Sequence, residues 1–171
     1  MQRTRWTERR FHLDLPPGWM PNVLERLRGT HPRLLVLATG LNEERATEQA
    51  NGAWSIKQHI GHLSDLEALH TGRIDDFLAG AEVLRAADMQ NRATEQADHS
   101  ARSLAELIDR FAAQREDFIQ RLGSLDDATC SRAILHPRLQ VPMRPVDMAY
   151  FTAEHDDHHL ASMRTLVGTT K

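Results

Sequence analysis

The stretch WSIKQHIGHLSDLEALHTGRIDDFLAG, residues 54–80, carries a long helical signal. Ser55 followed three residues later by Gln58 is a capping-box pattern, which satisfies free amide groups at a helix start. Apolar residues then recur every three or four positions, as they do on one face of a helix, and Gly80 is a natural stop. The apolar positions are Ile56, Ile60, Leu63, Leu66, Leu69, Ile74, Phe77 and Leu78. We therefore expect a helix of about seven turns.

Three other regions carry the same kind of pattern. Residues 21–40 predict two short helices or one kinked helix, because Pro32 fits the first turn of a helix. Residues 103–123 begin with a second capping-box pattern, and residues 145–168 begin with a proline. Four helical regions with almost no strand signal predict an all-α protein built as a helix bundle.

The segments between these regions are polar or rich in proline. Residues 40–53 end in an Asn-Gly pair and are typical of a loop, and residues 82–100 also read mostly as loop. Residues 131–145 hold three prolines within nine positions, which predicts an irregular crossover with at most a short extended segment.

Composition narrows the class of protein. We expect one domain over residues 1–171, with residues 1–20 as an N-terminal arm. The net charge of −3 gives no reason to expect a nucleic-acid partner. The single cysteine, Cys130, excludes an internal disulfide and a cysteine-based zinc site. No apolar run approaches the ~20 residues of a membrane helix, and no secretory signal is visible. We expect a cytoplasmic protein with no membrane partner.

The arm itself is basic. Four of its first ten residues are arginines, which could contact an anionic partner. The favoured interpretation is a solvated arm whose Trp6 and Phe11 pack on the domain.

The stretch EHDDHHLASM, residues 154–163, places three histidines within five positions. On a helix, His155 and His159 lie on either side of the centre of the apolar stripe, with His158 on its flank, and Asp156 and Asp157 turn toward solvent. Two imidazoles four residues apart can share one metal ion, as in the HExxH helix of zinc proteases. The general-base glutamate of that motif is absent here, and the pair could instead hydrogen-bond to other buried groups.

Two imidazoles make a weak, open site, so a metal would need a third ligand. The helix at 54–80 offers His59, His62 and His70. Helical periodicity places His59 and His70 within the apolar stripe and His62 at its edge. Periodicity alone would therefore favour His59 or His70.

Two stretches together resemble the DinB/YfiT-like superfamily of metal-dependent enzymes. Residues 54–74 are similar to its Trp-Ser…His-Leu-x-Asp-x-Glu pattern, and residues 151–166 contain its C-terminal His-x-x-x-His. Residues 132–143, RAILHPRLQVPM, also look like the family's linking segment, and the resemblance extends over about residues 21–167. The matching positions are Trp54, Ser55, His62, Leu63, Asp65 and Glu67 in the first stretch and His155 and His159 in the second.

The resemblance implies a four-helix bundle with up-down-down-up topology. It also implies a divalent metal held by His62, His155 and His159, which overrules the periodicity argument, and it implies a homodimer. Imidazole suits zinc and nickel equally, and three such ligands leave a coordination position open, as in catalytic sites. Asp65, one turn from His62, and Arg73, on the same helix face, are candidate catalytic or orienting residues. The roles of His59, His70 and His158 stay open.

The leading hypothesis is a metal-dependent enzyme that acts on a small molecule by thiol transfer, for which the resemblance implies a low-molecular-weight thiol as partner, or by hydrolysis. The competing hypothesis is a non-enzymatic metal-binding stress or interaction protein. A ferritin-like di-iron centre is disfavoured, because it needs Glu-x-x-His pairs that the sequence lacks.

Overall fold

The computed structural model describes residues 4–49 and 52–168, and it is a four-helix bundle, as predicted. Two consecutive short helices that meet at Gly29 form the first member of the bundle, and three long helices form the others. The members are α1 (Met20–Arg28) with α2 (Thr30–Ala38), α4 (Ile56–Ala79), α6 (Leu104–Gly123) and α8 (Pro145–Gly168).

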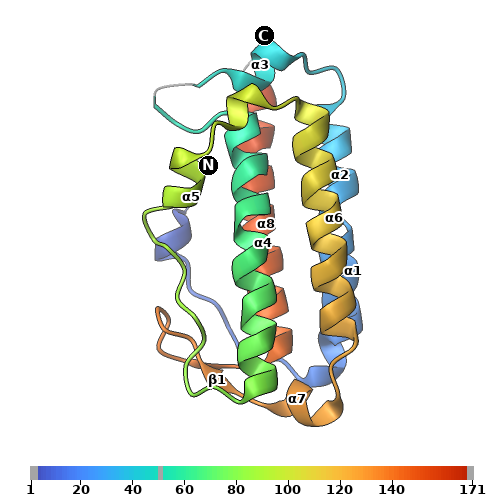
Figure 1. The fold of residues 1–171 in the computed structure, drawn as a ribbon, viewed down its shortest axis with the longest axis vertical. Coiled ribbons are helices and arrows are strands. Elements are labelled where there is room, and N and C mark those ends of the chain that lie inside the picture. The colour runs from blue at the N-terminus through green and yellow to red at the C-terminus, as the bar shows by residue number, and fades with distance from the viewer. Residues whose placement is uncertain (1–3, 50–51, 169–171) are drawn as a thin grey trace.

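The topology is up-down-down-up. In Figure 1, α1 and α2 lead from the bottom to the top, α4 and α6 both run downward, and α8 returns to the top. α6 packs against α4 and against α1 and α2, and α8 packs against the same neighbours. Because α4 and α6 are parallel, residues 81–103 must climb the full height of the bundle between them, and this crossover forms part of the wall of the site described below.

The capping signals act as the sequence predicts. The Ser55 side chain accepts a hydrogen bond from the Gln58 amide at 3.2 Å, and the Gln58 side chain accepts one from the Ser55 amide. Gly80 ends α4 with a φ of 65°, a left-handed conformation that favours glycine. Ser103 and Glu106 form the same reciprocal box at the start of α6.

The segments predicted wholly or mostly as loop, residues 40–53 and 82–100, contain the short helices α3 (Glu43–Thr47) and α5 (Arg92–Gln96), which the prediction missed. Other short elements are the helix α7 (Asp127–Ser131) and the 3-10 turns η1 (Trp6–Glu8), η2 (Pro17–Trp19) and η3 (His99–Ala101). Each is one or two turns long and buries too few apolar residues to produce a periodic pattern. Asn51, from the Asn-Gly pair, lies outside the described residues.

The proline-rich crossover, predicted as irregular with at most a short extended segment, contains such a segment. β1 (Ile134–Leu135) and β2 (Pro142–Met143) pair antiparallel, with Ile134 opposite Met143. This small hairpin closes the lower end of the bundle near the start of α8.

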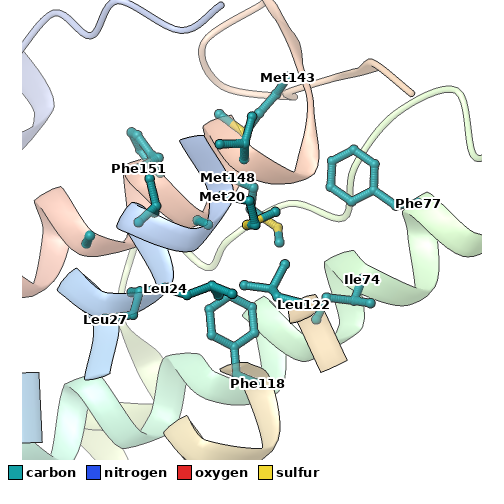
Figure 2. Close-up of a cluster of buried hydrophobic side chains, with 14 of the residues drawn as sticks. Met20, Leu24, Leu27, Ile74, Phe77, Phe118, Leu122, Met143, Met148 and Phe151 are labelled. Carbon is teal, nitrogen blue, oxygen red and sulfur yellow. The ribbon is translucent and has the colours of Figure 1, made fainter. Parts of the chain in front are cut away.

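The apolar core is divided into two clusters. Figure 2 shows the lower one, where side chains from α1, α4, α6 and α8 meet around Phe118. The upper one gathers around Phe111 and Ile60. Along each helix of the bundle, polar residues occupy the positions between the two clusters; they are Thr30, Glu67, His70, Arg115, His155, Asp156 and His159. The middle of the bundle is therefore polar and buried.

The N-terminal arm packs as expected from its aromatic residues. The ring centroids of Trp6 and Phe11 lie 5.0 and 4.9 Å from that of Phe151 on α8. Arg9 forms an ion pair with Glu154, so a basic residue of the arm is used within the chain. Arg3 lies outside the described residues.

Candidate metal centre

Three histidines converge at mid-height between α4 and α8. They are His62 from α4 and His155 and His159 from α8, all of them buried. Each offers a ring nitrogen, and the three nitrogens lie within 4.8 Å of one another. We refer to these residues as the histidine cluster. His62 joins it from α4, which packs against α8.

The imidazoles of the cluster are neutral at physiological pH. Burial lowers the pKa of His62 to about 4, the nearby His70 and His99 add to the effect, and Asp65 opposes it. Burial and the neighbouring histidines lower the pKa values of His155 and His159 well below the ordinary value. Neutral imidazole is the form that binds metals.

The spacing of the cluster suits a metal ion. The Nε2 atoms of His155 and His159 are 3.1 Å apart. Two nitrogens bound to one tetrahedral zinc, each at about 2.0–2.1 Å, lie about 3.3 Å apart. The donor set of three imidazoles suits zinc or nickel. The residues present thus fit a divalent ion both in chemistry and in spacing.

His62 is oriented by a hydrogen-bonded chain. Its Nδ1 lies 3.0 Å from Thr94 Oγ1, and the Thr94 hydroxyl donates to Asp65 Oδ2 at 3.0 Å. With the hydroxyl hydrogen directed to Asp65, Thr94 must accept from Nδ1–H, which leaves the Nε2 lone pair for a ligand. Asp65, a candidate from the sequence, is therefore placed behind Thr94. Sequence reasoning missed Thr94 because it lies on α5, within the predicted loop.

Gly61 makes room for a further residue of this hydrogen-bonded series, His99. A Cβ atom on Gly61 would lie 2.4 Å from the His99 ring. Without it, His99 packs directly on α4, and its Nε2 reaches Asp65 Oδ2 at 2.9 Å. Asp65 is thus held from two sides.

The other candidate histidines surround the cluster. His59, which periodicity favoured as a ligand, places its Nδ1 2.8 Å from Nδ1 of His159 and lies behind that ring. His70 lies with its Nδ1 3.5 Å from Glu67 Oε1, and His158 lines the pocket described below. Two indole rings cover the cluster. The ring centroid of Trp54 lies 4.7 Å from that of His62, and the ring centroid of Trp6 lies 4.9 Å from that of His155.

The prediction for the aspartates of α8 was wrong. Asp156 is fully buried, accepts from both terminal nitrogens of Arg115, and accepts from Thr30 Oγ1 at 2.8 Å. Asp157 is half-buried and pairs with arginines of α1 and α2. Helical periodicity assumes one buried face, but α8 is packed against α1 and α2 on the side opposite the histidines.

Arg115 also binds Glu67, whose Oε1 lies 2.6 Å from Arg115 Nη2. Burial alone would raise the pKa of Glu67, but Arg115 and His70 outweigh it and lower the pKa to about 2. We call Thr30, Glu67, Arg115 and Asp156 the ionic layer. Glu67 is one of the positions on which the family resemblance rests, and here it has a partner of opposite charge.

A pocket of about 430 Å³ opens beside the histidine cluster. This volume lies within the range of small-molecule sites. Its walls come from α4, α8, the crossover, the hairpin and the arm; they include Trp6, Trp54, Leu66, Leu69, Arg73, Met89, His136, Arg138 and Phe151. The cluster is therefore accessible to a small molecule, and Arg73 lies on the same wall.

The chain belongs to the DinB superfamily, whose family model matches residues 26–163. A search of curated proteins found no match. No helix in residues 4–49 and 52–168 has the length and apolar character needed to cross a membrane.

Solved structures share the fold. One is YfiT from Bacillus subtilis, described as a probable metal-dependent hydrolase with an unusual four-helix bundle topology. It has 16% identity and a TM-score of 0.78, with 93% of this chain and 91% of that chain covered. Another is the mycothiol-dependent maleylpyruvate isomerase, with 13% identity and a TM-score of 0.68. The match covers 88% of this chain and 61% of the isomerase.

Proposed function

We propose that this protein is a metal-dependent enzyme that acts on a small molecule by thiol transfer or hydrolysis. His62, His155 and His159 would hold zinc or nickel. The observation that carries the proposal is the meeting of three buried, neutral imidazoles at the wall of a pocket. A divalent ion there would supply Lewis-acid chemistry, by lowering the pKa of a bound water or thiol or by polarising a carbonyl.

The residues of the chain have distinct tasks in this proposal. Thr94 and Asp65 fix the ring orientation of His62, and His59 does the same for His159. Trp6 and Trp54 exclude water around the cluster and bind the apolar part of a substrate. The partly buried Cys130 has a pKa raised by burial, so it is a poor nucleophile.

The relatives by fold support both reaction classes. The name of YfiT points to metal-dependent hydrolysis, and the name of the isomerase points to a low-molecular-weight thiol as co-reactant. The competing function, a non-enzymatic metal-binding stress or interaction protein, would need no accessible space at the cluster. The pocket beside the cluster favours an enzyme. The homodimer remains a prediction, which sedimentation velocity would test.

The first test is the metal content of protein purified without a His tag. We expect about one zinc or nickel ion per chain, and its loss in His155→Ala/His159→Ala. Screens for thiol transfer and for ester or amide hydrolysis would then separate the two reaction classes. Wild-type protein that neither carries nor takes up zinc or nickel would overturn the proposal.

A further inference from the structure

The far wall of the pocket carries two arginines, Arg73 and Arg138, that form no ion pair among the described residues. Arg73 on α4 is 3% exposed and lines the pocket. Its Nε donates to the carbonyl oxygen of Arg85 at 3.2 Å, and among the described residues nothing accepts from its two terminal nitrogens. Burial, together with repulsion from Arg138 and Arg85, lowers the pKa of Arg73 to about 10, although Asp76 opposes the effect.

Arg138 lies beside it, on the turn between β1 and β2. Its guanidinium packs 5.8 Å from the centroid of the Phe151 ring, and within the described part of the chain it forms no ion pair. Burial lowers the pKa of Arg138 as well. A buried guanidinium usually has a carboxylate partner, because leaving the charge unpaired is costly.

His136 completes the group. It is 2% exposed and lines the same pocket. Its Nδ1 accepts a hydrogen bond from the Leu139 amide at 3.2 Å, so the ring hydrogen of the neutral form is on Nε2. That Nε2 is buried and has no hydrogen-bond partner. The Nε2–H of a residue that lines the pocket is therefore a buried donor without an acceptor among the described residues.

Two carboxylates lie near this wall, and among the described residues neither forms an ion pair with Arg73 or Arg138. Asp76 pairs with Arg85, and Asp88, which lines the pocket, accepts hydrogen bonds from the amides of Gln90 and Arg92 at 3.0 and 2.9 Å. The surface between the arginines and the histidine cluster is apolar, with Leu66, Leu69 and Phe151. The pocket thus has a cationic end, an apolar middle and a metal-ligand end.

We propose that Arg73, Arg138 and His136 form a binding site for a carboxylate, so that the substrate is a small organic acid with an apolar body. Guanidinium groups bind carboxylates through paired, charge-assisted hydrogen bonds, and the His136 Nε2–H supplies a further donor. The carboxylate would orient the substrate with its reactive group toward the histidine cluster. This inference rests on the proposed function for the reaction, but the carboxylate site itself does not require a metal.

Two pairs of probes test the site. On zinc-loaded protein, 6-mercaptohexanoate is compared with the neutral 6-mercaptohexanol by calorimetry. On metal-free protein, hexanoate is compared with hexanamide by ligand-observed NMR. We expect the acid to bind about tenfold more tightly than its neutral match in each pair. The preference should fall to less than about threefold in Arg138→Met and in Arg73→Met.

Arg121→Met is the matched control, because Arg121 pairs with Asp75 on the outside of the bundle. It should keep the full preference. Arg138 is partly exposed, so we expect Arg138→Met to fold. It still measures the loss of acid preference if Arg73→Met fails to fold. Equal binding of acids and neutral probes would overturn the carboxylate site, as would a preference that survives both substitutions. If the protein binds no metal, the proposed function fails, and the metal-free pair still decides on the carboxylate site.

Discussion

The two faces of α8 hold buried polar groups of opposite character. On one face, Asp156 belongs to the ionic layer, where Arg115 binds two carboxylates and Thr30 donates a further hydrogen bond. On the other face, the adjacent His155 belongs to the histidine cluster, whose three rings are neutral. Both regions are at mid-height between the two apolar clusters.

The two regions differ in which partners their buried polar atoms have. The charges of the ionic layer pair within the chain, because Arg115 binds both Glu67 and Asp156, although Glu67 Oε2 has no hydrogen-bond partner among the described residues. In the cluster, the Nε2 atoms of His155 and His159 face each other at 3.1 Å, and in the proposed function a shared cation would bind both. The ionic layer is therefore held by ion pairs within the chain, and the histidine cluster is the region where we propose a ligand.

The largest effect is expected from Arg115→Met. This change leaves Glu67 and Asp156 buried without a positive partner, which should lower the free energy of unfolding by about 3–5 kcal/mol. Urea denaturation of metal-free protein measures it. Arg121→Met, which removes an exposed ion pair, should cost less than about 1 kcal/mol. Similar losses in both variants would mean that the ionic layer does not stabilise the fold.

A pH titration should separate the two regions. In metal-free protein, the unfolded chain takes up protons on its histidines as the pH falls below about 6.5. Folded His62 and His136, with pKa values of about 4, do not. The free energy of unfolding should therefore fall between about pH 6.5 and pH 4, by roughly 2–3 kcal/mol for each of these histidines.

Glu67 acts in a lower pH window. Its folded pKa of about 2 lies below that of the unfolded chain, so its contribution is present above about pH 4.5 and is lost toward pH 2. Urea titrations at each pH give the profile. His136→Gln should reduce the fall in the free energy of unfolding between about pH 6.5 and pH 4. His12→Gln, at an exposed position, should leave that fall unchanged. A profile that is level from pH 6.5 to pH 4 would contradict the neutral histidine cluster.

The smallest effect is expected from Thr94→Val, which removes the link between His62 and Asp65 while keeping the shape of the side chain. Metal affinity should fall about 10- to 100-fold, because outer hydrogen bonds orient metal-binding rings. Competition with a chromophoric chelator gives the affinity. Thr165→Val, at an exposed position on α8, is the matched control and should leave it unchanged. Unchanged metal affinity in Thr94→Val would show that the hydrogen bonds through Thr94 do not orient His62.

The sequence predicts the long helices because each buries a stripe that continues over several turns. It also places His155 and His159 on the inner face of α8, by the same periodicity. Asp156 was misplaced because its partner, Arg115, is 41 residues away, and helical periodicity carries no information on such pairs. Thr94 was missed for a related reason, since the five-residue α5 has no stripe of its own. His62 was selected through the family resemblance, since periodicity pointed to His59 and His70.

X-ray absorption at the metal edge tests the central claim most directly. The histidine cluster predicts about three imidazole nitrogens at about 2.0–2.1 Å around zinc, with an oxygen donor such as water in the open position. His62→Ala should remove one imidazole from that shell and leave the ionic layer unaffected, as judged by urea unfolding without metal. A bound metal with one imidazole or none, or a shell that does not change in His62→Ala, would contradict the account.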